Sequence, residues 1–241
     1  MIAWYAKSLT SGEVREQNAD AVLPSASTIK VLLALAFWRA VQRGELRAAH
    51  PYATQPWAAV GGSGVLQGFQ HAARITLADL VHLSLAVSDN YATNIVASFV
   101  GLSAVNALAA QLGLAHTAMQ RNMMDEEARE AGQENLTCAR DLATLIEEVA
   151  TGTQLGEAVC APVLRSLELQ EHRDALPRRL PAGVTYAGKP GELDDGYHYH
   201  DCGLLSRGND RIVMAVMTVG EGGPEAVSGT AADLFAALAQ P

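Results

Sequence analysis

Cysteine is scarce in this sequence. Its three cysteines, Cys138, Cys160 and Cys202, are odd in number and lie far apart along the chain. A disulfide framework is built from paired cysteines, and a cysteine zinc site from closely spaced ones, so the sequence argues against both. We predict that the three thiols are small buried side chains.

Basic residues are outnumbered by acidic ones. The chain has 17 Lys and Arg against 26 Asp and Glu, which gives a formal net charge of −9 at pH 7. Nucleic-acid binding depends on lysine and arginine, so this balance argues against a nucleic-acid partner.

Long apolar runs are also missing. The run "VLLALAFW" at residues 31–38 is too short to span a bilayer, and Arg39 and Arg43 follow it. The N-terminus lacks a basic segment followed by an apolar run and a small-residue cleavage site, so no signal peptide is visible. We predict no membrane association, and a cytoplasmic location for the chain as written or a periplasmic or secreted one if a leader was removed. No oligomeric state is predicted.

Strand patterns lie at both ends of the chain, and helical patterns lie between them. Alternating segments bounded by turn residues predict strands at 2–9, 13–23, 183–192, 197–208 and 210–220. Helical spacing predicts helices at 27–44, 76–86, 90–100, 103–112, 137–150, 154–169 (broken at Pro162) and 224–239. Residues 115–135 are weakly periodic and are predicted to form a long loop.

This order of elements predicts the architecture. We expect an α/β (α+β) fold in which both chain termini form an antiparallel sheet flanked by helices, with an all-helical lobe inserted. The chain is then a single domain, 1–241, of two lobes. Residues 1–45 and 180–241 form the α/β lobe, and residues 46–179 form the mainly helical lobe.

The stretch "SASTIK" (residues 25–30) opens the most apolar predicted helix. There Ser27 and Lys30 share one helix face, and the free N–H groups of the helix start suit an oxyanion. A lysine in a partly apolar pocket loses its proton more easily, so Lys30 is a candidate base for a nucleophilic Ser27. The alternative is a helix-start serine and a solvated lysine, because this spacing is common by chance.

A second candidate is the tripeptide Ser88-Asp89-Asn90 between two predicted helices. All three residue types cap helices well, so a purely structural role is one interpretation. In the functional one, Ser88 relays a proton toward a leaving group. Asn90 then donates its amide to the substrate, and Asp89 braces the loop.

The third candidate is Lys189-Pro190-Gly191, after an alternating strand pattern. A lysine before a Pro-Gly turn is common. Alternatively, Lys189 faces a cleft, binds a substrate carboxylate and holds Ser88 in place. The strand beyond Gly191 then supplies a second oxyanion N–H from Glu192.

Ser-x-x-Lys, Ser-Asp-Asn and Lys-x-Gly occur here in that order. The set resembles the penicillin-recognising serine hydrolases, and most closely the class A β-lactamase family. The segments "GSGVLQ", "ITLADLVHLSLAVSDNYATN", "NLTCARDLATLIEEV" and "LPAGVTYAGKPG" are similar to class A segments, so the resemblance covers most of the chain. Asn94 falls where the family keeps an asparagine. The resemblance implies a mixed α/β lobe with an antiparallel sheet, an all-helical lobe, and a site between them.

One departure from the family concerns its deacylation glutamate. Class A enzymes carry a Glu-x-x-x-Asn pattern in the long loop, and the matching region "MQRNMMDEEAREAGQENLT" has none. Depending on the alignment, Asn122 or Met123 takes the place of the glutamate. The loop also offers carboxylates that are either deacylation bases or a solvated surface, namely Asp125, Glu126, Glu127 and Glu134.

The second departure is Pro190, where the family usually has Thr or Ser. Proline offers neither a hydroxyl nor an N–H to a substrate carboxylate. Glu192 adds a negative charge beside the expected carboxylate pocket. We expect carboxylate recognition to be weakened or altered.

Other motifs favour structural interpretations. His198 and His200 share a strand face, and with Asp201 they are candidate metal ligands, but we favour a surface or edge strand because no third histidine is close. Met123 and Met124 are expected to fill the core. The glycine-rich "GGSGVLQGF" lacks the Lys-Ser/Thr of a phosphate-binding loop.

We therefore predict a serine β-lactamase-like hydrolase of small-molecule substrates that needs no cofactor or metal. Ser27 forms the acyl-enzyme, Lys30 is the base, Ser88 and Lys189 complete the catalytic set, and Asn90, Gly191 and Glu192 bind substrate. Deacylation is expected to be slow. The alternatives are a D-Ala-D-Ala-type peptidase or esterase acting on a substrate other than a β-lactam, and a sensor or binding module that is acylated without turnover.

Overall fold

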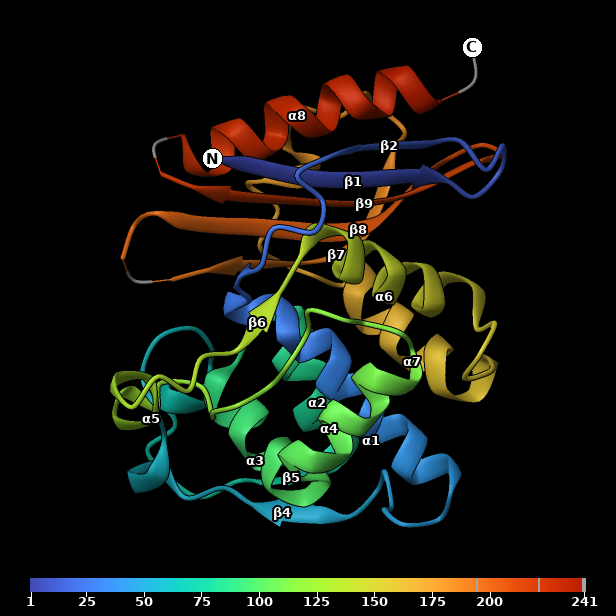
Figure 1. Ribbon diagram of the computed structural model, residues 1–241. Coiled ribbons are helices and arrows are strands. Elements are labelled where there is room, and N and C mark those ends of the chain that lie inside the picture. Colours follow the sequence, from blue (N-terminus) through green and yellow to red (C-terminus); the bar gives the residue numbers. More distant parts are fainter. Residues whose placement is uncertain (194, 221, 240–241) are drawn as a thin grey trace.

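Strands from both ends of the chain build one antiparallel sheet (Figure 1). In this computed structural model, which describes residues 1–193, 195–220 and 222–239, the strand order is β2-β1-β9-β8-β7. The strands are β1 (Ile2–Ser8), β2 (Val14–Gln17), β7 (Thr185–Glu192), β8 (His198–Arg207) and β9 (Asp210–Val219). Every neighbouring pair is antiparallel, which confirms the predicted sheet formed by the two termini.

The apolar sequence of β9 explains its central place. Its residues 212–218 are all buried, which requires cover on both faces of the sheet. Helix α8 (Gly223–Leu238) packs on one face and α6 (Ala139–Thr151) on the other (Figure 1). Two hydrophobic clusters result, one beneath α8 and a larger one that extends from the other face into the helices.

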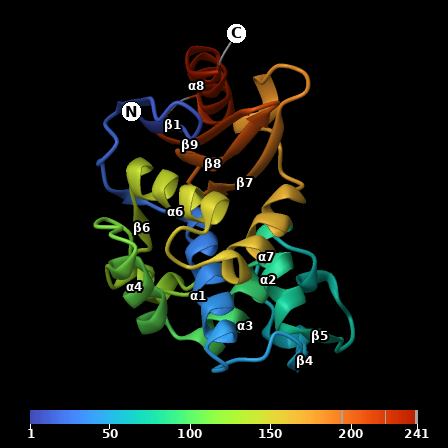
Figure 2. The same ribbon diagram turned by 90° about the vertical axis from the view of Figure 1, so that its right-hand side faces the viewer.

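Helix α1 (Lys30–Gln42) passes through the middle of the remaining helices (Figure 2). Its first eight residues are all buried, as its nearly continuous apolar surface predicts. It packs against α2 (Leu77–Ala86), α3 (Asn90–Val100), α4 (Leu102–Gln111) and α7 (Glu157–Glu168). These bounds confirm the predicted helices to within a few residues.

Short elements complete the described part of the chain. The remaining α-helix among the described residues is the short α5 (Glu126–Glu130). Strand β3 (Leu23–Pro24) pairs with β6 (Leu136–Thr137), and β4 (Pro51–Ala53) pairs with β5 (Arg74–Thr76). The 3-10 turn η1 (Ala26–Ile29) leads directly into α1. The division into two lobes, 1–45 with 180–241 and 46–179, stays a prediction. Helix α6 belongs to the predicted helical lobe, 46–179, but it packs against the sheet strands β1, β8 and β9.

Several local predictions were wrong. Pro162 does not break α7, because in the second turn it removes one intrahelical bond while Val159, Val163 and Leu167 keep the helix packed. The predicted strand 13–23 ends at Gln17, since β2 is fully exposed and has only β1 as a neighbour. Thr137 belongs to β6, and the side chain of Cys138 caps α6 instead.

The cysteine prediction is confirmed. All three are buried and unpaired. Burial raises the pKa of both Cys138 and Cys160 to about 12, so these thiols stay protonated.

In the part of the chain that the structure describes, no single helix has both the length and the apolarity needed to cross a membrane. Helices α3 and α4 meet that test only as a pair, and they are bent by 82° at the break between them.

Candidate active site

Ser27 lies in η1, where the chain enters the central helix beside the edge strand β7. The preceding Ala26 has a φ of +47°, which costs a non-glycine residue about 1–2 kcal/mol. The backbone of Gly191 in β7 approaches so closely that a Cβ there would lie 3.0 Å from the Ser27 nitrogen. Gly191 was predicted to bind substrate. The structure shows that its missing side chain lets β7 reach the turn that carries Ser27.

Lys30 lies behind Ser27 and is fully buried. Its Nζ donates to the Ser88 carbonyl oxygen at 2.7 Å, to Ser88 Oγ at 3.0 Å and to Asn90 Oδ1 at 2.8 Å. Among the side-chain hydrogen bonds of the described residues, none joins Lys30 to Ser27, although the Lys30 backbone N–H donates to the Ser27 carbonyl. Burial, reinforced by the positive charge of Lys189, lowers the pKa of Lys30 well below the usual 10.5.

The Ser88-Asp89-Asn90 loop is braced by its middle residue, as predicted. Asp89 Oδ2 accepts from the N–H groups of Val65 and Leu66, both at 2.8 Å, and Oδ1 caps α3 through the N–H of Ala92 at 2.9 Å. Ser88 has a φ of +57°. The hydrogen bonds of Asp89 hold the neighbouring Ser88 in this strained backbone conformation.

Asn90 is largely committed within the protein. Its Oδ1 accepts from Lys30 and its Nδ2 donates to the Gly61 carbonyl at 3.0 Å. The side-chain amide that was predicted to donate to the substrate therefore already donates one N–H to the protein. The Asn90 backbone N–H donates to the Ser63 carbonyl at 3.0 Å, which ties the glycine-rich loop to α3.

Lys189 is also fully buried, but it does not make the contact predicted for it. Its Nζ donates to the Pro190 carbonyl at 2.6 Å, and within the described residues Ser88 bonds to Lys30 instead. Burial lowers the pKa of Lys189 to about 8. The buried Asp201 carboxylate opposes this shift, and burial raises the pKa of Asp201 itself to about 7.

The end of β7 determines where its backbone donors point. The N–H of Leu193 donates to the His198 carbonyl in β8 at 3.2 Å. Successive N–H groups along a strand point to opposite sides, so the N–H of Glu192 points away from β8. Because β7 is an edge strand, that side is the open edge of the sheet beside η1.

One cavity of about 380 Å³ brings the predicted residues together. It is lined by Ser27, Ser88 and Lys189 and by the β7 residues Pro190, Gly191 and Glu192. A smaller cavity of about 80 Å³ adjoins Ser27 on the side of Asn90 and the loop 121–135. Lys30 lies beneath Ser88, so it reaches the larger cavity through the Ser88 hydroxyl. The catalytic and binding roles of these residues stay predictions.

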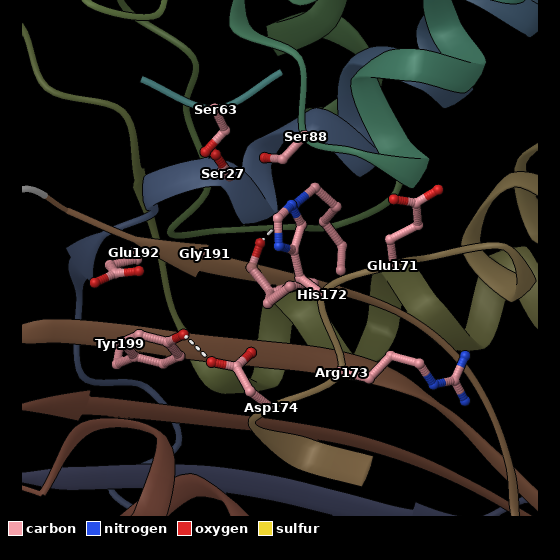
Figure 3. Close-up of a pocket in the computed structure, with 12 residues that line it drawn as sticks. Ser27, Ser63, Ser88, Glu171, His172, Arg173, Asp174, Gly191, Glu192 and Tyr199 are labelled. Atoms are coloured by element: carbon pink, nitrogen blue, oxygen red, sulfur yellow. Dashed lines mark hydrogen bonds between the residues drawn. The ribbon is translucent and has the colours of Figure 1, made fainter. Parts of the chain in front are cut away.

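Sequence reasoning missed part of the cavity wall. Ser63 lines both cavities, and its hydroxyl lies with those of Ser27 and Ser88 in Figure 3. The glycine-rich context of Ser63 was the available signal. Residues 171–174, together with Tyr199, form the opposite wall. Residues 171–174 come from an irregular segment after α7, where no periodic pattern points to a site, and Tyr199 comes from β8.

The long loop contains no carboxylate at either predicted glutamate position. Asn94 accepts from the Met123 N–H at 2.8 Å and donates to the Met123 carbonyl at 3.0 Å, so buried Met123 is pinned beside the small cavity. Asn122 is exposed. Met124, predicted to fill the core, is 37% exposed, because its φ of +61° turns it away from the core that Met123 enters.

The four candidate loop carboxylates have other partners or lie at the surface. Glu134 forms a two-pronged ion pair with Arg121 at 3.0 and 3.1 Å, and Glu126 pairs with Arg129 at 3.1 Å. Both line the small cavity. Asp125 caps α5, and Glu127 is exposed.

The paired histidines are held by protein atoms. The Nε2 of His200 lies 2.9 Å from the Pro24 carbonyl, its Nδ1 accepts from the Thr218 N–H at 3.3 Å, and His198 pairs with Asp195 at 2.6 Å. No group of three or more His, Cys, Asp or Glu among the described residues is arranged to hold a metal ion. The prediction that these histidines lie on a surface or edge strand is wrong, because β8 lies between β7 and β9 and His200 is buried.

Known proteins resemble this chain in sequence. Residues 1–240 match the model of the β-lactamase enzyme family. The D-alanyl-D-alanine carboxypeptidase DacB2 of Mycobacterium tuberculosis is 30% identical over 237 residues, covering 92% of this chain and 76% of that protein. The chain spans only 38% of another relative, the β-lactamase regulatory protein BlaB of Streptomyces cacaoi, at 28% identity over 120 residues.

Solved structures extend the match to three dimensions. A β-lactamase from Sphaerobacter thermophilus has a TM-score of 0.89 at 28% identity, covering 100% of this chain and 93% of that one. A mutant of PBP-A, solved as an acyl-enzyme complex with penicillin G, has a TM-score of 0.88 at 27% identity, covering 98% and 89%. The fold is thus that of a β-lactamase-type serine hydrolase. The chain belongs to the β-lactamase enzyme family.

Proposed function

We propose that this protein hydrolyses amides or esters through an acyl-enzyme on Ser27. The observation that carries the proposal is the buried Lys30 amine, which bonds to Ser88 Oγ directly behind the cavity that Ser27 lines. Burial favours the neutral amine, and a neutral amine accepts a proton. The acyl-enzyme complex of PBP-A supports the same chemistry in a similar fold.

In the acylation step, Ser27 Oγ attacks the substrate carbonyl carbon while its proton moves to Lys30 Nζ. The negative charge that develops on the carbonyl oxygen is stabilised by the backbone N–H groups of Ser27 and Glu192. The outward direction of the Glu192 N–H at the edge of β7 supports this assignment.

Collapse of this intermediate breaks the bond from the carbonyl carbon to the leaving nitrogen or oxygen. Ser88 Oγ gives its proton to the leaving atom and recovers one from Lys30 across their 3.0 Å hydrogen bond. Lys30 is then neutral again, the leaving group departs with its proton, and the acyl group remains on Ser27. Lys189 contributes positive charge to the same cavity.

Deacylation by water is the slow step in this proposal. It requires a base beside the ester, and buried Met123 occupies the loop position that adjoins the small cavity. The two carboxylates that line this cavity, Glu126 and Glu134, are paired with arginines. The hydrogen bonds from Arg121 reach both oxygens of Glu134.

Two other functions fit the same acylation chemistry. A peptidase or esterase on a substrate other than a β-lactam is favoured by Pro190, which offers no donor to a carboxylate. The relative DacB2 is named as a carboxypeptidase. A sensor or binding module that is acylated without turnover is favoured by the loop just described, and the relative BlaB is named as a regulatory protein.

Burst kinetics test the proposal and separate its variants. We expect a neutral p-nitrophenyl ester to release about one equivalent of nitrophenolate per protein, followed by a slower steady rate. Nitrocefin and a D-Ala-D-Ala peptide then show which substrate turns over. A nitrophenolate trace for Ser27→Ala that matches the parent protein would overturn the acyl-enzyme on Ser27.

A further inference from the structure

We propose that the leaving-group end of the larger cavity selects a substrate with a positively charged group and rejects a carboxylate. The inference rests on the proposed function. Ser88, which protonates the leaving atom in that proposal, lines the larger cavity and not the smaller one. The leaving group therefore occupies the larger cavity, whose far wall is formed by residues 171–174 and Tyr199.

Two possible anion donors at this wall, Tyr199 and Arg173, are directed elsewhere. The Tyr199 hydroxyl donates to Asp174 Oδ2 at 3.0 Å (Figure 3). The Arg173 guanidinium lies over the Tyr186 ring at 5.2 Å, and Figure 3 shows it extending away from Ser27 and Ser88. Pro190 has neither a hydroxyl nor an N–H. The Tyr199 hydroxyl and the Arg173 guanidinium are thus engaged by other groups of the protein, so a carboxylate on the leaving group finds its donors among the remaining lining residues, such as Ser63, His172 and Lys189.

The charges at this end are mainly negative. The side chains of Glu171, Asp174 and Glu192 all line the cavity, and all three are exposed to it and to solvent. The cationic side chains that line the cavity are buried Lys189, which donates to the Pro190 carbonyl, and Arg173, whose guanidinium lies over the Tyr186 ring. Like charges on the wall repel a carboxylate and attract an ammonium, so the wall discriminates between substrates by charge.

Three thioesters with the same acyl group and different leaving thiols provide the test. Hippuryl thioesters of thiocholine, mercaptoacetamide and mercaptoacetate carry a cation, a neutral group and a carboxylate. All three give the same acyl-enzyme, so differences in acylation rate report only the leaving-group end. After division by the rate of hydroxide-catalysed hydrolysis, we expect the cationic ester to react fastest and the carboxylate ester slowest. The rate should fall about fivefold from the cationic to the neutral ester and about fivefold again to the carboxylate ester, which is the effect expected of one exposed ion pair.

Charge-neutral variants locate the effect. Glu171→Gln and Asp174→Asn keep the side-chain shapes, and the amide introduced by Asp174→Asn retains an oxygen for the Tyr199 hydroxyl. Each is expected to reduce the ratio of cationic to carboxylate rates severalfold. Glu157→Gln, an exposed carboxylate at the start of α7, is the matched control and should leave the ratio unchanged.

The outcomes are distinct. A carboxylate thioester that acylates Ser27 as fast as the cationic one overturns the inference and leaves the acyl-enzyme proposal standing. A charge preference that survives in the Glu171→Gln, Asp174→Asn double variant also overturns it. If none of the three thioesters acylates Ser27, the proposed function itself fails, and the inference falls with it.

Discussion

Two buried lysines dominate the candidate site at the level of single residues. Lys30 and Lys189 are both fully buried, and desolvation is the main reason that the pKa of each is lowered. The positive charge of Lys189 lowers the pKa of Lys30 further. A lysine in this environment gives up its proton at a pH where an exposed lysine keeps it.

The acylation rate should therefore depend on pH through Lys30. Below its lowered pKa, Lys30 is protonated and cannot accept the Ser27 proton. We expect the rate with a neutral ester to rise with pH and to level off well below pH 10.5, and stopped-flow measurement gives this profile. In Lys30→Arg the guanidinium keeps its proton at every pH tested. This variant should therefore show no rise of rate with pH, and its acylation rate should be lower by about 100-fold or more. A Lys30→Arg protein with the parent profile would show that Lys30 is not the base.

Motifs revealed some of these residues and packing revealed the others. The spacing of Ser27 and Lys30 is visible in the sequence, and so is the capping capacity of Asp89. Whether the Lys189 amine reaches Ser88 or Pro190 depends on the direction of a side chain within a packed interior, which spacing alone does not fix. The glycine-rich context of Ser63 indicates a loop, but only the folded loop places this serine beside Ser27.

At the scale of elements, the slow deacylation that we propose depends on the loop 115–135. Asn94 in α3 holds the Met123 backbone by two hydrogen bonds, so the loop has a fixed position beside the small cavity. A base introduced at Met123 would lie on the Ser27 side of this loop.

Met123→Glu is expected to accelerate deacylation. The added carboxylate can take a proton from water near the acyl group, and general-base catalysis is worth about 100-fold when well placed. We expect at least a tenfold increase, measured as loss of the acylated mass after excess ester is removed. Met123→Gln has a similar shape without a base and should match the parent. Equal acceleration by Gln would mean that loosening of the loop, and not a base, is responsible.

Helices and strands with long, regular apolar patterns could be predicted from the sequence, and those without such patterns could not. Helix α1 and strand β9 have long buried runs whose lengths and turn residues mark them clearly. The pattern misled at Pro162, because a local rule against proline was outweighed by the packing of α7. The exposed helix α5 has no apolar face, so its capping by Asp125 was the only signal.

For the whole molecule, the sheet joins the two ends of the chain. Strand β1 lies between β2 and β9, and its residues Ala3 and Ala6 are fully buried. The order of strand and helix patterns was enough to predict this closure. The two cavities beside Ser27 were not predictable, because they arise where residues from distant segments meet.

Removal of β1 should therefore unfold the protein. Deletion of residues 1–8 exposes the edge of β9 and removes both pairings of β1, a loss comparable with the roughly 5–15 kcal/mol that stabilises a typical domain. Near-UV circular dichroism and a thermal melt should show no cooperative transition. Val14→Ser on the exposed strand β2 is the control and should change stability by about 0.5 kcal/mol or less. A cooperative melt of the deleted protein would contradict this view of the sheet.

The most direct test of the account is the intact mass of the whole protein after reaction with a neutral activated ester and, separately, with penicillin G. The account predicts one added acyl group from the ester, located by peptide mapping on Ser27, and no added mass on Ser27→Ala. An adduct on another residue, or equal labelling of Ser27→Ala, would contradict it.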